Sequence, residues 1–320
     1  MKKSVEISIG RKFLNLKTLI SFLIAIFIFY AIFAKFDITQ VIGAIKGINI
    51  PYFVLAAVLF LLVFPLSALR WRIFLRNLGT NNKLKELTEI TVLSWFANNI
   101  VPAKIGDLYK GYLMRKNYNF PISKAMGTIF MERLVDMIFI AIFIFISGLA
   151  IFKWSIPKNI MLPLIVLFIL ILTAVGALFF MNSFQLWLFR IVPKRLKHIA
   201  ENFHFGLLNC VKLREAHIII LYTILSWLVQ AVSVFFVIKA LNLNMPVFLI
   251  IFITLANALL TAVPITPGGL GVGEAAIAGI LISFRMEYSL AMLTSILIRV
   301  ITYWIVLIFG GALYLASARK

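Results

Sequence analysis

Long apolar runs separated by short polar segments make up most of the chain. A helix crosses a bilayer with about 20 predominantly apolar residues, and several runs come close to or exceed that length. They cover residues 18–34, 51–69, 127–152, 161–181, 218–238 and 288–316. The pattern therefore predicts an all-α integral membrane protein of about six full spans, with residues 1–320 forming a single membrane domain.

Two further apolar segments are interrupted by polar or glycine-rich breaks. Residues 87–101 are too short to span, and the charged return over 107–115 cannot span either. Non-helical backbone at membrane depth is tolerated only where protein or a wet cavity surrounds it. We therefore expect a re-entrant helical hairpin here. Residues 255–274 (LANALLTAVPITPGGLGVGE) echo residues 96–107 (FANNIVPAKIGD), and they predict a second hairpin.

The two hairpins indicate an internal repeat. Asp107 and Glu274 open the return helices and lie 167 positions apart, whereas Arg133 and Arg299 on the next apolar helices lie 166 apart. Each arginine also follows a threonine by five positions. Two features thus agree on one period, although chance recurrence is an alternative. The predicted boundaries are about 51–152 for repeat one and about 216–316 for repeat two.

Composition and charge set the environment. The chain is 63% hydrophobic and 13% charged, which a water-soluble domain of this size could not accommodate. Its net charge of +20 would favour nucleic acid in a soluble protein, but basic residues mark cytoplasmic loops in a membrane protein. If the first hairpin enters and leaves on one side, most basic residues share that side. This predicts a multi-pass protein of the cell membrane with both termini cytoplasmic, membrane lipids as partners and no nucleic acid.

The same topology makes the second hairpin enter from the opposite side, so that the repeat has inverted topology. Paired broken helices in inverted repeats are typical of secondary transporters. Residues 183–215, between the repeats, combine basic residues with apolar positions at helical spacing. They predict a cytoplasmic amphipathic segment on the inner leaflet.

Enzymatic chemistry finds little support in the sequence. The single cysteine, Cys210, excludes a cysteine-based metal site, and the three histidines lack ligand spacing. The GGLGVG run follows an apolar helix rather than a strand, so it does not indicate dinucleotide binding. We expect no metal, no cofactor and no enzyme activity. The oligomeric state stays open.

Ionisable residues inside the spans are the first candidates for function, because a charge at the bilayer centre costs at least about 2.5 kcal/mol. Arg133 has Glu132 beside it and Asp136 one turn on, so an intrahelical ion pair is one interpretation. Arg299 has no acid nearby in sequence. Its predicted partner is Glu274 or an anionic headgroup, which a guanidinium fork binds well.

The breaks are the second group of candidates. Each leads into a helix whose free amides and positive dipole end favour an anion, unless the acids Asp107 and Glu274 cap the helix themselves. Lys104 and its basic neighbours, among them Lys110, are expected to contact anionic headgroups. Further candidates for hydrogen bonds to substrate are Asn98, Asn99 and Asn257, and those for gating are Pro102, Gly106, Pro267, Gly268, Gly269 and Gly271.

Three motifs in order resemble one membrane family. They are SWFANNIVPAKIGDLYKGYLMRK, GTIFMERLVDMI and ITPGGLGVGEAA, and they are similar to the transmembrane domain of lysylphosphatidylglycerol synthases and to flippase-like relatives. The resemblance covers nearly the whole chain. It implies that the membrane part moves a modified anionic lipid between leaflets. We expect no synthase activity, because these residues contain no counterpart of the soluble aminoacyl-transfer domain. The residues matching the family pattern are Asn99, Pro102, Gly106, Asp107, Glu132, Arg133, Asp136, Pro267, Gly268, Gly269, Gly271 and Glu274.

Three functional hypotheses follow. The first is a translocase of an anionic phospholipid or lipid-linked intermediate, whose headgroup crosses a polar cleft between the hairpins. The second is a secondary transporter of a small soluble anion. The third is a non-transporting scaffold or regulator of envelope or glycan assembly.

Overall fold

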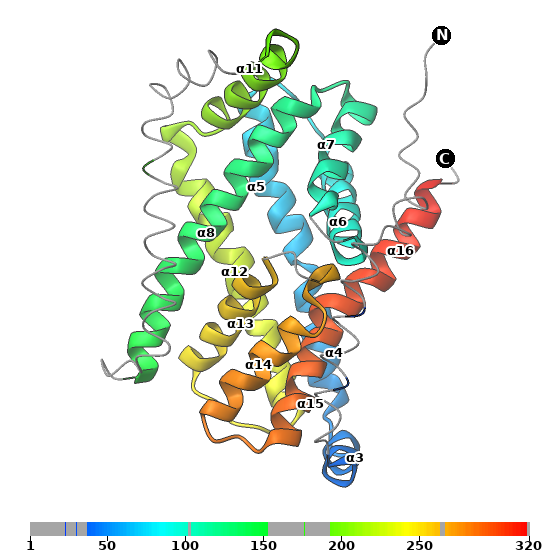
Figure 1. The fold of residues 1–320 in the computed structure, drawn as a ribbon, viewed down its shortest axis with the longest axis vertical. Helices are drawn as coiled ribbons and strands as arrows, with labels where there is room; N and C mark the ends of the chain where they lie inside the picture. The colour runs from blue at the N-terminus through cyan, green and yellow to red at the C-terminus, as the bar shows by residue number, and fades with distance from the viewer. Residues whose placement is uncertain are drawn as a thin grey trace.

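The structure is a computed structural model and describes residues 37–101, 104–152, 193–262 and 266–318, besides three isolated positions. Helices and their connections account for all of these segments, and no strand occurs among them. The predicted spans at 18–34 and 161–181 lie outside the described residues, as does Pro102. Figure 1 shows the arrangement. In chain order the helices are α3 (Ile38–Lys46), α4 (Ile50–Leu61), α5 (Val63–Asn77), α6 (Leu84–Ile100), α7 (Ile105–Tyr118), α8 (Ile122–Phe152), α11 (Lys194–Asn209), η1 (Leu213–Glu215), α12 (Ala216–Ala240), α13 (Val247–Ala262), η2 (Pro267–Gly269), α14 (Val272–Ser283), α15 (Tyr288–Arg299), η3 (Val300–Trp304) and α16 (Ile305–Ala318).

Four helical stretches of the described chain are long and apolar enough to cross a membrane. They are Ile50–Asn77, Ile122–Phe152, Leu213–Ala240 and Tyr288–Ser317. Each overlaps a predicted span, so the sequence reading of a multi-helix membrane protein is confirmed. The first stretch continues beyond its predicted end at residue 69 and carries Arg70 into the interior, where that side chain is 2% exposed.

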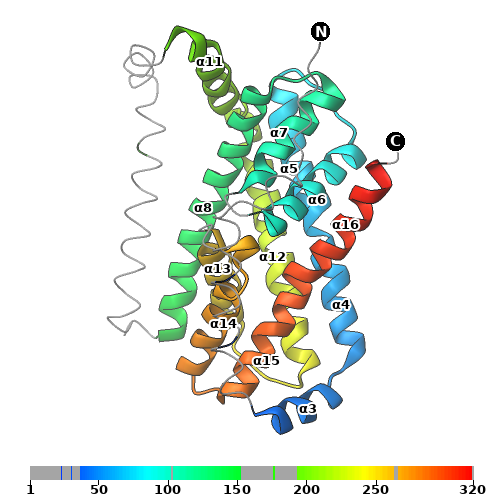
Figure 2. The ribbon, with the colours of Figure 1, turned by 45° about the vertical axis from the view of Figure 1, so that its right-hand side comes forward.

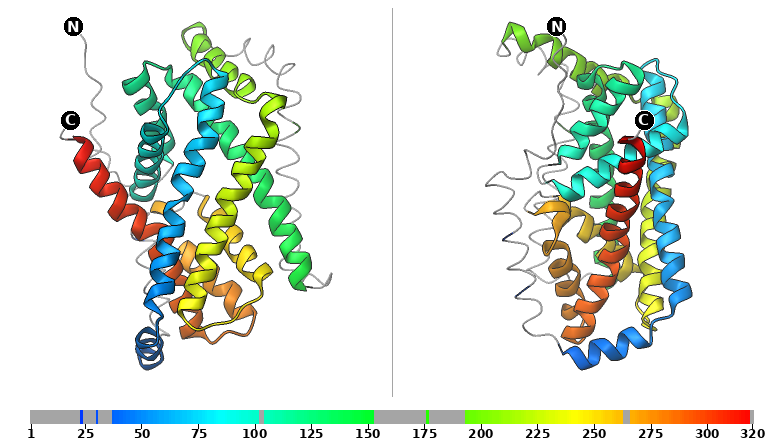
Figure 3. Two further views of the ribbon diagram at one scale, coloured as in Figure 1. Left: turned by 180° about the vertical axis from the view of Figure 1, so that it is seen from behind. Right: turned by 90° about the vertical axis from the view of Figure 1, so that its right-hand side faces the viewer.

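The short helices occupy opposite ends of the molecule. We call the end at which α7 and α11 lie the upper end and that of α3 the lower end. In Figure 1, α6 and α7 lie in the upper half and α13 and α14 in the lower half, whereas α8 and α12 extend through both. Figure 2 gives the same impression from another side. Behind them, α4 and α5 pack along α12, as the left view of Figure 3 shows.

The break between α13 and α14 is formed by residues that permit unusual backbone. Gly268 and Gly271 have φ angles of +55° and +77°, which favour glycine over residues with a side chain. Thr266 donates a hydrogen bond from its hydroxyl to the carbonyl of Leu270 at 2.8 Å and closes the turn. The chain can therefore reverse within a few residues while its polar backbone groups remain satisfied.

The apolar core has an upper and a lower part. The upper cluster gathers side chains such as Trp71 and Phe74 of α5 with Met114 of α7. The lower cluster packs Phe60 and Ile253 together with residues of α14 and α15. Polar groups lie between the two clusters, and they form the site described below.

Helix α11 occupies part of the predicted amphipathic segment 183–215. It packs across the upper part of α8. Leu196 and Ile199 are 51% and 53% exposed on it. Exposed apolar side chains on a helix with basic residues are typical of a membrane interface. The predicted cytoplasmic position of this helix stays a prediction.

Candidate functional site

A polar cavity of about 200 Å³ lies where the two breaks approach each other. Both arginines singled out in the sequence, Arg133 and Arg299, line it. Lys104 contributes from the first break and Gly268 from the second. Residues that are far apart in the sequence thus share one enclosed space between the apolar clusters.

Arg133 pairs across the first hairpin rather than along its own helix. Its Nη2 lies 2.9 Å from Oδ1 of Asp107, and its Nε donates to Oδ2 of the same carboxylate at 3.3 Å. The predicted intrahelical partner Asp136 is instead bound by Arg70. The interpretation of an Arg133–Asp136 pair is therefore wrong, because a second arginine from α5 takes that carboxylate.

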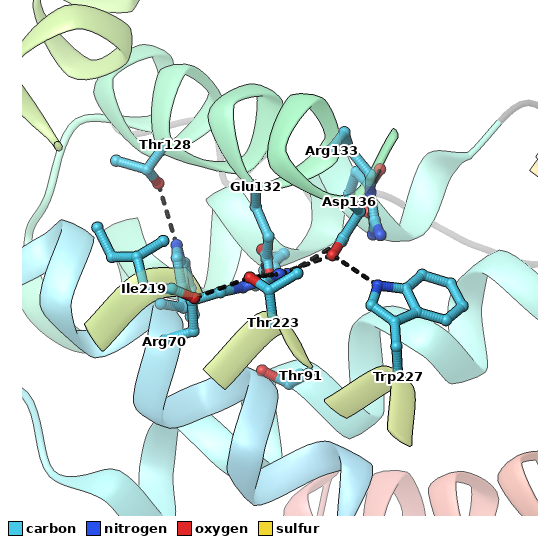
Figure 4. A network of polar contacts seen from close by, with 12 residues as sticks. Arg70, Thr91, Thr128, Glu132, Arg133, Asp136, Ile219, Thr223 and Trp227 are labelled. Atoms are coloured by element: carbon cyan, nitrogen blue, oxygen red, sulfur yellow. Dashed lines mark hydrogen bonds and ion pairs between the residues drawn. The ribbon is translucent and has the colours of Figure 1, made fainter. Parts of the chain in front are cut away.

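Arg70 is the centre of a buried network that Figure 4 shows in close-up. Its Nη1 donates to Asp136 Oδ1 at 2.6 Å and to the hydroxyl of Thr223 at 2.9 Å, and Nη2 donates to Asp136 Oδ2 at 2.9 Å. Nη2 also reaches Glu132 Oε1 at 3.2 Å. The indole of Trp227 donates to Asp136 Oδ1 at 3.3 Å. The network ties α5, α8 and α12 together at membrane depth.

Lys110 completes this network from α7. Its Nζ lies 2.7 Å from Glu132 Oε2 and 4.0 Å from the ring centre of Trp71. The side chain is 3% exposed. The expectation that Lys110 contacts lipid headgroups is therefore wrong. Its carboxylate partner and an aromatic face offset the cost of burying the ammonium group.

Arg299 and Glu274 meet, as one of the two sequence hypotheses predicted. Arg299 Nε donates to Glu274 Oε1 at 3.1 Å, and Nη2 donates to the carbonyl of Gly268 at 2.7 Å. Glu274 also caps its own helix, because its Oε2 accepts the backbone amide of Gly271 at 2.7 Å. One carboxylate therefore serves as both cap and ion-pair partner.

The two halves build the same contact. In each, an acid in the first turn of the returning helix pairs with an arginine of the following long helix, Asp107 with Arg133 and Glu274 with Arg299. The preceding arm contributes an asparagine in both cases. Asn98 accepts the amide of Gly106 at 2.8 Å, but Oδ1 of its counterpart Asn257 is buried without a hydrogen-bond partner.

The breaks touch each other through Tyr303. Its hydroxyl donates to the carbonyl of Asn99 at 3.0 Å. A side-chain Cβ at Gly268 would lie 2.4 Å from Cε2 of the same ring, so glycine is needed there for space as well as for its backbone angle. Tyr303 belongs to η3, a short π-helical stretch directly after Arg299. Such stretches interrupt helices most often at functional sites.

Lys104 differs from the other cations of the cavity. In the described part of the chain it forms no hydrogen bond and no ion pair, and its φ of +55° places it in the left-handed region that disfavours lysine. The other three cations on the wall, Arg70, Arg133 and Arg299, each pair with a carboxylate. Lys104 therefore presents an uncompensated positive charge to the cavity.

The predicted residues divide into those on the cavity wall and those behind it. On the wall are Asn98, Asn99, Lys104, Arg133, Asp136, Asn257, Gly268 and Arg299. Behind it, Asp107, Glu132 and Glu274 hold the cations. Backbone positions of the breaks that do not line the cavity are Gly106, Pro267, Gly269 and Gly271.

The sequence analysis missed Arg70, Ser226 and Trp227. Arg70 follows an apolar run directly and was counted with the cytoplasmic loop, although its place only three turns before the end of a long helix was a signal. Neither Ser226 nor Trp227 is distinguishable in sequence from ordinary residues of an apolar span. Within the described ranges, no cluster of three or more histidine, cysteine or acidic residues could hold a metal ion.

Comparison with known proteins places the chain. It is 38% identical over 229 residues to a UPF0104 membrane protein of Methanocaldococcus jannaschii, covering 70% of this chain and 95% of that protein. A UPF0104 membrane protein of Pyrococcus horikoshii is 22% identical over 88% of the chain and 92% of its own length. Part of the glycosyltransferase AglD of Haloferax volcanii is 30% identical over 105 residues, which is 33% of this chain and 17% of that enzyme.

The family model described as the lysylphosphatidylglycerol synthase transmembrane region matches residues 18–310, which is most of the chain and includes both breaks and both paired arginines. The protein therefore belongs to the lysylphosphatidylglycerol synthase transmembrane-region family.

Proposed function

We propose that this protein moves a lipid with an anionic headgroup, either a phospholipid or a lipid-linked intermediate, from one leaflet to the other. The observation that carries the proposal is the composition of the cavity wall. Four cationic side chains, Arg70, Lys104, Arg133 and Arg299, and a single acid, Asp136, line it. Such a wall favours a negative charge at membrane depth, while the lipid tails would remain in the surrounding bilayer.

The placement of the hairpins supports the proposal. The helices α6 and α7 lie in the upper half and α13 and α14 in the lower half, and each pair turns back near the cavity (Figures 1 and 2). We interpret them as re-entrant hairpins of an inverted repeat within a protein of about six spans. Basic residues on the connections of the upper end then place both termini in the cytoplasm.

The contact between the breaks supplies a gate. The hydroxyl of Tyr303 holds the carbonyl of Asn99, and its ring lies against Gly268. Alternating access in inverted-repeat proteins comes from movement of one repeat against the other around a fixed site. We propose that separation of the two breaks opens the cavity toward one leaflet at a time.

A leaflet assay tests this function. The full chain is reconstituted into vesicles with a fluorescent anionic phospholipid, and a membrane-impermeant quencher reports how fast the label changes leaflet. Wild-type protein should accelerate the exchange, and Lys104→Gln should slow it, because the free positive charge is lost. Lys212→Gln is the matched control, since Lys212 is exposed and does not line the cavity. Exchange no faster than in protein-free vesicles, over a panel of anionic lipids, would contradict the proposal.

A role in glycan assembly is the second candidate. It is favoured by the likeness of one third of the chain to part of a glycosyltransferase. In this case the protein would carry or position a lipid-linked intermediate, without itself being an enzyme. The third possibility, transport of a small soluble anion, is separated by uptake measurements in the same vesicles.

A further inference from the structure

The cavity contains more unused hydrogen-bonding capacity than the ion pairs explain. Among the described residues, three of its buried wall atoms have no hydrogen-bond partner: Arg70 Nε, Ser226 Oγ and Asn257 Oδ1. Their residues are 2%, 4% and 9% exposed. A buried polar atom without a partner costs about 1–3 kcal/mol. Such a concentration on one wall indicates a polar ligand that supplies the missing partners.

The unpartnered groups include both donors and acceptors. Arg70 Nε can only donate, the carboxamide oxygen of Asn257 can only accept, and the hydroxyl of Ser226 does both. Hydroxyl groups on the ligand satisfy all three. A ligand ammonium group would serve only the acceptors, and the cations of the wall would repel it.

The charge balance fixes the charge of the ligand. Five cations face four carboxylates around the cavity, and each cation except Lys104 forms a salt bridge. One positive charge is therefore in excess, and a single negative charge on the ligand neutralises it. The residues counted are Arg70, Lys104, Lys110, Arg133 and Arg299 against Asp107, Glu132, Asp136 and Glu274.

The anionic and the polar parts of the wall are adjacent. Asn257 Oδ1 and Arg299 Nε would lie 2.9 and 3.2 Å from a Cβ built on Gly273, so glycine lets the carboxamide and the guanidinium approach each other. A phosphate near Arg299 therefore places its substituent beside Asn257. The cavity of about 200 Å³ limits that substituent to a small group, since water occupies about 30 Å³ per molecule.

We propose that the cavity recognises a singly charged phosphate ester of a small polyhydroxyl group, such as glycerol or one sugar ring, and selects against headgroups that carry an ammonium group. This inference rests on the proposed function and names its substrate class. Lys104 and Arg299 hold the phosphate, and Asn257, Ser226 and Arg70 Nε bind the hydroxyls. The same chemistry occurs in a lipid headgroup and in a soluble sugar or polyol phosphate.

Calorimetric titration of the purified full chain tests the inference. The probes are water-soluble dihexanoyl lipids: phosphatidylglycerol, phosphatidylethanolamine and phosphatidic acid, with glycerol 3-phosphate as the soluble counterpart. Phosphatidylglycerol should bind on the order of tenfold more tightly than phosphatidylethanolamine, the effect of one or two hydrogen bonds to charged or buried partners.

Two variants locate the recognition. Ser226→Ala removes one hydroxyl with little risk to folding, and Asn257→Leu removes the carboxamide. Each should weaken phosphatidylglycerol binding about tenfold and leave phosphatidic acid binding unchanged. The matched controls are Ser317→Ala and Asn209→Leu, both at exposed positions outside the cavity. They should bind like the wild type.

The outcomes separate the two proposals. If both variants bind phosphatidylglycerol as the wild type does, or if phosphatidylethanolamine binds equally well, the headgroup inference is overturned while an anionic lipid can still be the substrate. If glycerol 3-phosphate binds as tightly as dihexanoyl phosphatidylglycerol, the headgroup chemistry holds but the lipid function is contradicted in favour of a soluble substrate.

Discussion

Every arginine on the cavity wall is held by a carboxylate from another helix. Arg70 of α5 binds Asp136 of α8, Arg133 of α8 binds Asp107 of α7, and Arg299 binds Glu274. Breaking a buried pair by removing one partner leaves an uncompensated charge and costs about 3–5 kcal/mol. These side chains therefore fix the geometry of the helices around the cavity as well as its charge.

Arg70→Leu should destabilise the protein by about 3–5 kcal/mol, because Asp136 loses its cationic partner in the interior. Thermal unfolding of the detergent-purified protein measures the effect. Arg72→Leu is the matched control two positions away. Arg72 is exposed and forms no salt bridge in the described chain, so this change should stay within about 0.5 kcal/mol. Equal effects of the two substitutions would contradict the network.

A pH dependence is expected at the start of α15. Glu287 accepts the amides of Ser289 and Leu290 at 2.9 Å each, and these bonds hold its pKa below the usual glutamate value, with the charge of Asp37 acting in the opposite direction. Because the folded-state pKa is lowered, the stabilisation is present at neutral pH and is lost as the pH falls through that value. Comparing the thermal stability of wild type and Glu287→Gln should show a difference that shrinks toward about pH 3. A constant difference would contradict this account.

Some of these residues could be predicted from the sequence and others could not. Arg299 and Glu274 were paired correctly, because they are matched in position by Arg133 and Asp107 of the first half. Arg70 and Lys110 were assigned to loops or headgroups. A cation at the end of an apolar run looks the same in sequence whether it lies at the membrane surface or is buried against Glu132.

At the scale of the elements, length and apolarity sufficed to predict the spans. Four predicted runs correspond to membrane-length helices. The limits of α5 were wrong, since the helix continues to Asn77 past its buried arginine. The predicted break at residues 102–106 follows the end of α6 at Ile100, and the second break follows α13. Proline and glycine mark both breaks, but the pairing of their helices in space depends on tertiary contacts.

Close packing of α11 on α8 gives a prediction about these elements. A Cβ on Gly127 would lie 2.3 Å from the carbonyl oxygen of Phe203, which is backbone and cannot rotate away. Gly127→Ala should therefore destabilise the protein by about 1–3 kcal/mol, the usual cost of overpacking. Thermal unfolding in detergent measures the change.

The control for this prediction is Gly279→Ala on α14. Nothing lies within 4 Å of a Cβ at that position. Alanine should there stabilise the helix by about 0.5–1 kcal/mol through its higher helix propensity. If Gly127→Ala had the same effect as Gly279→Ala, the close approach of α8 and α11 would be contradicted.

At the scale of the molecule, the proposal requires the two halves to face opposite sides of the membrane. Asn81 lies exposed between α5 and α6 at the upper end, and Asn244 lies exposed between α12 and α13 at the lower end (Figure 1). The single native cysteine, Cys210, is replaced by serine for this test. An impermeant maleimide added to intact cells should then label Asn244→Cys and spare Asn81→Cys. Labelling of both positions from the same side would exclude inverted halves.

The most direct test of the central claim is native mass spectrometry of the gently purified full chain, which identifies any lipid that stays in the cavity. The account predicts a bound lipid with one net negative charge on wild type and on Lys212→Gln, and its loss from Lys104→Gln. A wild-type protein that carries no lipid, or only lipids without net charge, would contradict the claim that the cavity between the hairpins holds an anionic headgroup.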